Sequence, residues 1–307
     1  MRPFNADTDF HDDPYPSRRS ATPVTLPRRE PVIWGQAGDG PLDSAALERY
    51  AEQGFLVIPG LLDDAEVATL RAELDHLRSH WAGRGDARVI AEPGSGEVRS
   101  IFEVQALSRR LERLFRDPRL LGAARQVLGS EVYLHQTRIN FKPGFRGREF
   151  YWHSDFETWH VEDGMPRMRA LSCSISLTDN SPENGPLMLI PGSHRTFIGC
   201  VGETPENHYR QSLRRQEYGV PDDASLAHLA DAGGIETFTG RAGSVILFDC
   251  NTMHGSNSNI TPAPRSNIFG VYNSVDNTLL EPWCGLAPRP QFVANRRDLT
   301  PLTPVAV

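Results

Sequence analysis

Residues 151–160, YWHSDFETWH, place a histidine and an aspartate two positions apart, His153 and Asp155, among large aromatic side chains. If this stretch is a strand, both side chains point to one side and can bind one metal ion. A lone HxD triplet is a weak signal, and an ordinary strand end is the alternative. His254, in SVILFDCNTMHGSNSN, supplies a second imidazole directly after a predicted buried strand. Two imidazoles and one carboxylate form the facial triad that binds Fe(II) in non-haem oxygenases and leaves coordination positions open.

Arg265 adds a cation in TPAPRSN, directly before the next predicted strand. A dianionic 2-oxoacid can chelate two open positions on such a metal, while O2 takes the last one. The remote carboxylate of that cosubstrate needs its own cation, and a planar guanidinium suits a bidentate carboxylate pair. The alternative for Arg265 is a surface arginine after a proline-containing loop.

The segment EVYLHQTRINFK (131–142) alternates as a strand with two different faces. One face carries Val132, Leu134, Gln136, Arg138, Asn140 and Lys142, and the other carries Tyr133, His135, Thr137, Ile139 and Phe141. The polar part of the first face is either a solvated surface or the lining of a wet pocket. Arg138 either faces a substrate carboxylate or forms a structural ion pair. We interpret His135 and His160 as structural residues.

Helices precede the strands. Residues 42–44 offer N-cap side chains for a helix that ends at Gly54. The next segment, FLVIPG (55–60), is predicted to form a short buried strand. Asp63 or Asp64 can cap a second helix within 61–83. Leucines recur at helical spacing within 107–128, which predicts a third helix. Residues 203–235 are polar, with one predicted helix near 223–231. Further strands are predicted at 169–179, 187–194, 244–249 and 267–274.

This order predicts a mainly β protein with flanking helices, built on a double-stranded β-helix (jelly-roll, cupin-like) core. Residues 1–40 are expected to form an extended or partly disordered arm. Residues 41–307 are expected to form one domain, with a helical buttress at 41–129 and the jelly-roll core at about 130–285.

Composition limits the possible partners. A net charge of −7 argues against a nucleic-acid-binding protein. No apolar run approaches the roughly 20 residues that a membrane-spanning helix needs, and the N-terminus lacks a secretory signal. The four cysteines are scattered and form no CxxC pair, so we predict that they are reduced and mostly buried. We therefore expect a cytoplasmic protein.

The pattern HSD…H…R, with NGPLMLIPGSH between and YAEQGFLVIPGLL upstream, resembles the phytanoyl-CoA dioxygenase family of Fe(II)/2-oxoglutarate oxygenases. Within this family, DPYPSR, QTRINFKPGF and FYWHSDFETWHVEDGMP resemble members that hydroxylate ectoine. The resemblance runs from about residue 13 to residue 285.

The resemblance implies that ectoine, 2-oxoglutarate and O2 yield 5-hydroxyectoine, succinate and CO2. It assigns Fe(II) to His153, Asp155 and His254. It assigns the cosubstrate to Lys142, Arg265, Ser256 and Asn140, and the substrate to Gln136 and Trp159, with Arg138 as a further substrate candidate. Because halogenases of this superfamily lack the carboxylate ligand, Asp155 favours hydroxylation. A homodimer is also expected.

Three alternatives stay open. A related hydroxylase could act on another small zwitterionic, amino-acid-like substrate. A zinc hydrolase could use two histidines and an aspartate, but it would leave Arg265 unexplained. A non-catalytic jelly-roll binding protein is the third. Gly270, in NIFGVYN, stands where the resemblance predicts a bulkier apolar residue, and a side chain there could pack on the substrate.

Overall fold

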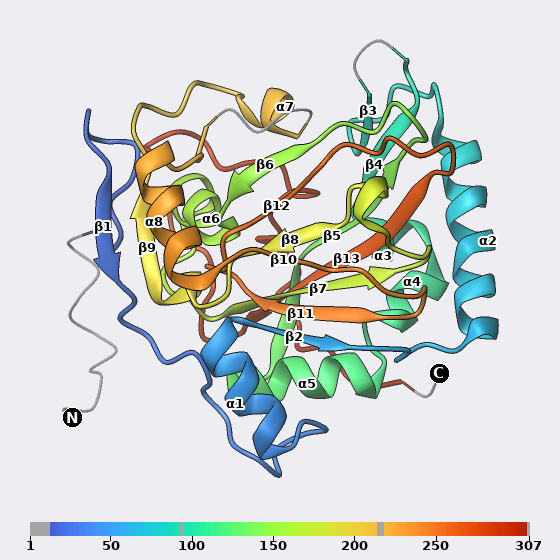
Figure 1. Cartoon of the computed structure of the whole chain (residues 1–307), viewed down its shortest axis with the longest axis horizontal. Helices are drawn as coiled ribbons and strands as arrows, with labels where there is room; N and C mark the ends of the chain where they lie inside the picture. The colour runs from blue at the N-terminus through green and yellow to red at the C-terminus, as the bar shows by residue number, and fades with distance from the viewer. Residues whose placement is uncertain (1–12, 93–94, 214–217, 306–307) are drawn as a thin grey trace.

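Two antiparallel sheets form the centre of the computed structural model, which describes residues 13–92, 95–213 and 218–305 (Figure 1). Within these residues, the large sheet has the strand order β2-β11-β7-β13-β5-β4-β3, and the small sheet has the order β10-β8-β12-β6. The large sheet consists of β2 (Phe55–Ile58), β3 (Val89–Ala91), β4 (Val98–Phe102), β5 (Val132–Lys142), β7 (Ala170–Ser176), β11 (Val245–Asp249) and β13 (Arg265–Ser274). The small sheet consists of β6 (Phe150–His153), β8 (Leu187–Leu189), β10 (Glu236–Thr237) and β12 (His254–Ser256).

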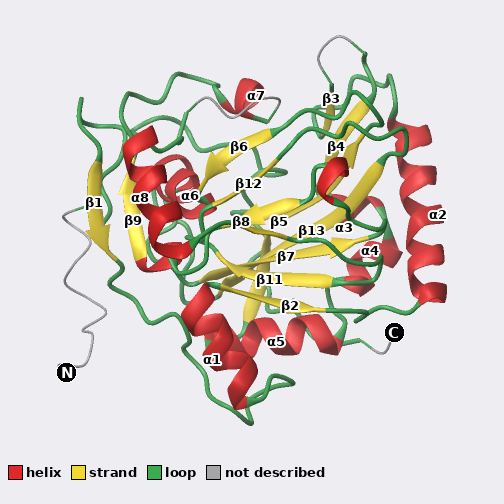
Figure 2. Cartoon of the chain, viewed as in Figure 1, coloured by secondary structure: helices red, strands yellow, loops and turns green. Residues whose placement is uncertain are grey.

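The large sheet has a different neighbour on each face. Toward the small sheet, Leu187 and Leu189 of β8 pack in one apolar cluster with Ile246 and Phe248 of β11. Toward the other side, apolar residues of the large sheet share a second cluster with the helices. In Figure 2 the strands lie in the middle and most helices lie around them. The expected mainly β, jelly-roll fold class is confirmed.

The first two long helices begin and end where their capping residues predict. In α1 (Ser44–Gln53), Asp43 accepts a hydrogen bond from the Ala46 N–H, and Gly54 ends the helix in the left-handed region at φ 84°. In α2 (Asp64–Trp81), Asp63 and Glu66 form a capping box. The apolar stripe of α2 is buried, and α2 flanks the sheets along one edge of the molecule (Figure 1).

The helical character predicted for 107–128 is correct, but the segment forms two helices and not one, α4 (Arg109–Leu114) and α5 (Pro118–Leu128). A short helix, α3 (Val104–Leu107), precedes them. Ser108 is extended and caps α4, and Asp117 caps α5, whose first residue is Pro118. Because proline disfavours a helical conformation in the residue before it, the chain breaks at this point.

The remaining elements lie at the periphery. Strand β1 (Val24–Pro27) pairs with β9 (Thr196–Gly199), and the helices are α6 (Asp155–Asp163), α7 (Tyr209–Ser212) and α8 (Asp223–Gly233), with short 3-10 turns at Pro182–Asn184 and Ser193–Arg195. The helix predicted near 223–231 is confirmed. Residues 1–12 of the expected arm lie outside the described residues. None of the helices in the described ranges is long and apolar enough to cross a membrane.

A β-bulge divides β5 into two parts with different orientations. The pairing of β5 with β13 shifts between Val271, opposite Gln136, and Tyr272, opposite Leu134. Before the bulge, Val132 and Leu134 belong to the helix-side core. After it, Gln136 lines a cavity between the sheets. The simple alternation predicted for 131–142 is therefore wrong at its beginning, because an extra residue in one strand reverses its faces.

Candidate active site

His153, Asp155 and His254 come together at one end of the small sheet. Strands β6 and β12 are antiparallel neighbours, and His153 lies directly opposite His254 in their register. Asp155 Oδ1 lies 3.8 Å from His153 Nε2 and 3.9 Å from His254 Nε2. All three potential ligand atoms lie within 4.8 Å of one another. This spacing suits a single ion bound between them.

Asp155 reaches this position from a helix and not from a strand. Strand β6 ends at His153, Ser154 accepts a hydrogen bond from the Glu157 N–H as the N-cap, and Asp155 is the first residue of α6. The assumption that His153 and Asp155 share one strand face is therefore wrong. Ser154 causes the change, because a capping serine starts a helix. Ser172 Oγ on β7 donates to Asp155 Oδ2 at 3.2 Å and orients the carboxylate.

Hydrogen bonds set both imidazoles for metal binding. His153 Nδ1 lies 2.7 Å from the Tyr151 carbonyl oxygen, and His254 Nδ1 lies 2.9 Å from the Thr252 carbonyl oxygen. Each Nδ1 must carry the proton to donate to a carbonyl, so each Nε2 presents a lone pair to the cluster. Backbone partners of this kind fix the tautomer of metal-binding histidines.

Electrostatics favour a neutral His153 and an ionised Asp155. Burial, and next the neighbouring His254, lowers the pKa of His153 to about 4. Burial alone would raise the pKa of Asp155, but His254, His153 and Arg138 bring it below its ordinary value. A neutral imidazole beside an ionised carboxylate is the donor set that Fe(II) takes in facial triads. The residues therefore fit Fe(II).

A cavity between the two sheets joins this cluster to the polar face of β5. It is lined by Arg99, Ser100, Phe102, Gln136, Arg138, Asn140, Phe141, Lys142, Phe150, His153, Asp155, Thr158, Trp159, Leu187, Leu213, His254, Gly255, Ser256, Arg265, Phe269 and Arg289. Every site residue expected from the sequence is in this set. Of the two interpretations of the polar face of β5, the pocket is therefore correct. Because strand residues rise by about 3.4 Å each, Gln136 and Lys142 mark two separated ends of the cavity.

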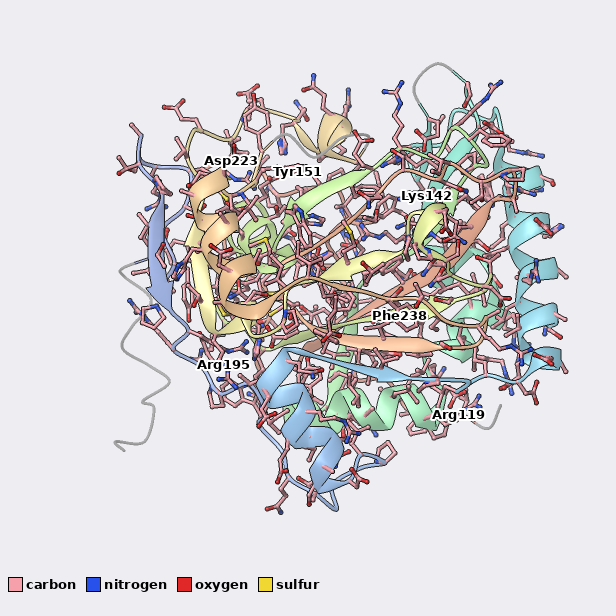
Figure 3. All side chains as sticks on the ribbon, in the orientation of Figure 1. Arg119, Lys142, Tyr151, Arg195, Asp223 and Phe238 are labelled. Carbon is pink, nitrogen blue, oxygen red and sulfur yellow. The ribbon has the colours of Figure 1, made fainter. Side chains whose placement is uncertain are left out.

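The Lys142 end concentrates positive charge. Lys142 lies opposite Arg265 in the β5–β13 register, and its Nζ donates to Ser256 Oγ at 2.9 Å and to the Asn257 carbonyl oxygen. Figure 3 shows Lys142 among the strands, whereas Arg119 and Asp223 lie toward the rim. Asn140 accepts a hydrogen bond from Ser100 Oγ at 2.8 Å. The predicted cosubstrate residues are thus neighbours.

Burial makes these cations unusually weak bases. Burial, and next Arg265 and Arg99, lowers the pKa of Lys142 to about 6. Burial lowers the pKa of Arg265 to about 10. Arg265 donates to the Asn267 side-chain oxygen at 2.7 Å, and its buried Nε has no hydrogen-bond partner in the described part of the chain. A dianion would stabilise this cluster, because an unpaired buried charge is costly.

The Gln136 end combines aromatic surface with a further arginine, Arg138. Gln136 donates from its amide to the Val293 carbonyl oxygen at 2.6 Å. Arg138 lies over the Phe269 ring, with its guanidinium carbon 4.9 Å from the ring centroid. Trp159 is buried and lines the cavity. Of the two roles left open for Arg138, the structural ion pair receives no support, since no ion pair with Arg138 occurs among the described residues.

Sequence reasoning missed Arg289, Thr158, Phe269 and Arg99, which also line the cavity. Arg289 makes a two-point ion pair with Asp163, at 2.7 and 2.5 Å. The sequence around Arg289, APRPQF, contains no motif that indicates a role, and it follows the last predicted strand by several residues. The one signal was Asp163 itself, because a carboxylate buried at a helix end requires a cation.

Three flagged residues lie outside the metal cluster. His160 is held between Asp13 and the Met165 carbonyl oxygen, at 2.7 and 2.8 Å. His135 packs edge-on against Trp159 at 5.1 Å between centroids. The suggestion that a side chain at 270 packs on the substrate is wrong, because a Cβ on Gly270 would lie 2.6 Å from the Phe115 ring. Phe115 belongs to the helix-side core.

Comparisons with known proteins agree with this geometry. A family model described as phytanoyl-CoA dioxygenase (PhyH) matches residues 50–267. An ectoine dioxygenase from Bordetella bronchiseptica is 58% identical over 294 residues, which cover 95% of this chain and 96% of the relative. A crystal structure of EctD from S. alaskensis with 2-oxoglutarate and 5-hydroxyectoine is 48% identical, has a TM-score of 0.87 and covers 96% of this chain and 98% of its own. A structure of EctD from S. alaskensis with bound Fe has a TM-score of 0.86 at 47% identity, with the same coverage.

Proposed function

The chain belongs to the phytanoyl-CoA dioxygenase family, and from this membership we propose that it is the Fe(II)- and 2-oxoglutarate-dependent dioxygenase that hydroxylates ectoine to 5-hydroxyectoine. One observation carries the proposal. A single cavity joins the triad of His153, Asp155 and His254 to a cationic end at Lys142 and to an aromatic, arginine-containing end at Gln136. A cosubstrate dianion and a small zwitterion each have a matching environment there.

The metal and cosubstrate are assigned by charge. His153, Asp155 and His254 hold Fe(II) through two imidazole nitrogens and one carboxylate oxygen. Arg265 and Lys142 bind the remote carboxylate of 2-oxoglutarate, because both are buried basic groups at the same end of the cavity. Ser256 and Asn140 complete that end of the cavity. The bound dianion neutralises the positive charge of the buried Lys142 and Arg265 side chains.

The substrate residues are assigned by shape and charge. Ectoine carries a cationic amidine and a carboxylate on a small ring. Trp159 presents an aromatic surface to the amidine, an interaction worth roughly 0.5–2 kcal/mol. Arg138 and Arg289 bring positive charge to the carboxylate, and Gln136 has a side-chain oxygen free to accept a hydrogen bond after its amide has bonded to Val293.

The protein orients the reactants and excludes water. When iron is bound, it supplies the oxidation in which O2 and 2-oxoglutarate yield succinate, CO2 and one hydroxyl group on ectoine. Ser172 orients the Asp155 carboxylate, and the backbone carbonyls of Tyr151 and Thr252 fix the orientation of the two imidazoles. The aromatic side chains at the Gln136 end keep the reacting ring carbon away from bulk solvent.

One turnover assay tests the proposal. The purified protein is loaded anaerobically with Fe(II), given 2-oxoglutarate and ectoine, exposed to air and analysed by mass spectrometry. We expect ectoine to gain one oxygen atom and succinate to form in equal amount. Succinate without oxidised ectoine would retain the oxygenase and reject ectoine in favour of another small zwitterion. Neither product, with iron shown to be bound, would overturn the mechanism.

We also propose one catalytic domain over residues 41–307, because helices and strands share one apolar cluster.

A homodimer is proposed on the basis of Phe145 and Ile260, which are 69% and 68% exposed on neighbouring loops. Analytical ultracentrifugation tests the proposed dimer, and a monomer at micromolar concentration would overturn it.

The four cysteines are free thiols, three of them buried, which supports a reducing, cytoplasmic location. The negative net charge supports a function without nucleic acid.

A further inference from the structure

Helix α6 carries three buried carboxylates beside the residues that line the cavity. Glu157, Glu162 and Asp163 are 1%, 4% and 0% exposed. The same helix begins with Asp155 and presents Thr158 and Trp159 to the cavity. Buried carboxylates destabilise a helix unless cations neutralise them. The cations that hold α6 therefore influence where the site residues lie.

Arg18, from the N-terminal arm, neutralises two of these carboxylates. Its Nε and Nη2 donate to the two carboxylate oxygens of Glu157, at 2.9 and 2.7 Å. Its Nη1 donates to Glu162 Oε1 at 2.5 Å. Burial alone would raise the pKa of Glu157, but Arg18 brings it below its ordinary value. The guanidinium fork thus spans positions 157 and 162 on α6, which a lysine could not match.

The backbone around Arg18 is held in an unusual conformation. Arg18 has a φ of 56°, which is uncommon for a residue with a side chain. Its N–H donates to the Cys200 carbonyl oxygen, and the Cys200 N–H donates to Ser17 Oγ. Ser17 Oγ in turn donates to Glu157 at 2.5 Å. A conformation of this cost persists only where the surroundings enforce it.

Arg18 also contacts a residue that lines the cavity. Its Nη2 donates to Thr158 Oγ1 at 3.2 Å, and the Thr158 hydroxyl donates to Glu157 Oε2 at 3.3 Å. The rotamer of Thr158 is thereby linked to the ion pair between Arg18 and Glu157. Trp159 follows directly in the sequence. Thr158 is thus the single side chain that separates Arg18 from the cavity.

We propose that Arg18 is a positioning residue for the substrate: it holds α6 so that Thr158 and Trp159 take the orientation that binds ectoine. The arm is then a working part of the active site, although Arg18 itself does not line the cavity. The identity of the substrate rests on the proposed function, but the link between Arg18 and α6 does not. The cosubstrate end, on β5, β12 and β13, is outside the reach of this contact.

The test compares Arg18→Lys with Arg49→Ala, a control at an exposed arginine on α1. For Arg18→Lys, we expect the KM for ectoine to rise by about tenfold or more, since small displacements of positioned groups have large effects. The KM for 2-oxoglutarate should change less than about twofold, and succinate should exceed 5-hydroxyectoine. A lower kcat with an unchanged KM for ectoine and an unchanged ratio of succinate to 5-hydroxyectoine would overturn the proposal. That result would indicate only that less of the enzyme is folded.

Two further measurements separate this proposal from the proposed function. Arg18→Lys should speed amide hydrogen exchange in residues 155–163, a result that needs no substrate; unchanged exchange would overturn the inference even if ectoine is hydroxylated. A double-mutant cycle with Thr158→Ala should give non-additive changes in the KM for ectoine, because the two residues act through one contact. Additive changes would exclude Thr158 as the link and overturn the proposal.

Discussion

His153 and His254 are register partners across β6 and β12, with ring centroids 4.3 Å apart. Each donates from Nδ1 to the carbonyl oxygen two residues earlier in its own chain segment. The two imidazoles therefore present equivalent nitrogens, and the backbone of the small sheet determines their orientation. Asp155 enters from a separate element, α6, and is the proposed ligand most easily tested alone.

Asp155→Ala should remove iron binding and hydroxylation together. Loss of even an outer partner of a metal ligand commonly costs ten- to a hundredfold, so loss of the carboxylate ligand should cost more than about 100-fold. The measurement is iron content after anaerobic loading, with product formation in the same samples. Ser172→Ala, which removes only the hydrogen bond to Asp155, is the milder control. Normal iron content with retained hydroxylation would show that Asp155 is not a ligand.

Binding of 2-oxoglutarate should take up a proton. Lys142 has a pKa of about 6 and faces Arg265 and Arg99, with Glu92 and Glu149 as the nearby acids. A neutral amine has two N–H groups, and Ser256 and Asn257 accept them. A bound dianion favours the protonated amine and raises this pKa. Affinity should therefore fall as pH rises above about 6, by up to about tenfold per unit.

Calorimetry of the anaerobic Fe(II) enzyme, in two buffers with different ionisation enthalpies, measures this proton uptake directly. Lys142→Met should bind 2-oxoglutarate more weakly and without the additional proton. Equal heats in both buffers for the unmodified enzyme would contradict the prediction.

Arg138→Met should stabilise the protein while weakening substrate binding. Burial lowers the pKa of Arg138, and Asp155 is the nearby carboxylate that opposes the shift. Because a buried charge without an ion-pair partner is costly, an apolar side chain of similar length at this position should raise the free energy of unfolding. The measurements are the urea midpoint of the ligand-free protein and the KM for ectoine. A lower midpoint would indicate that Arg138 is a structural residue, the alternative that the sequence left open.

Gly270→Ala should destabilise the protein without changing substrate binding. The new methyl group would lie 2.6 Å from the Phe115 ring, on the helix side of the large sheet. Overpacking of this kind typically costs about 1–3 kcal/mol. Thermal unfolding should show the loss, while the KM for ectoine stays within about twofold of the original value. An altered KM with normal stability would place residue 270 at the cavity after all. Phe269→Ala is the contrasting variant, since Phe269 does line it.

Patterns within short segments determined much of this protein. Capping residues such as Asp43 and Asp63 set helix starts because a cap acts over three or four residues. Alternation placed Arg138 and Lys142 on one strand face. The residue types at 153, 155, 254 and 265 were sufficient to predict the metal and cosubstrate chemistry, since ligands are chosen by their donor atoms.

Only the tertiary structure decided how these segments meet. A bulge opposite Val271 reversed the faces of β5, which no property of β5 alone reveals. Gly270 turned toward Phe115 because pairing with two neighbouring strands sets its face. Arg18 and Arg289, from opposite ends of the chain, became the partners of carboxylates on α6. A sequence pattern describes neighbours along the chain, whereas ion pairs and strand registers join residues more than a hundred positions apart.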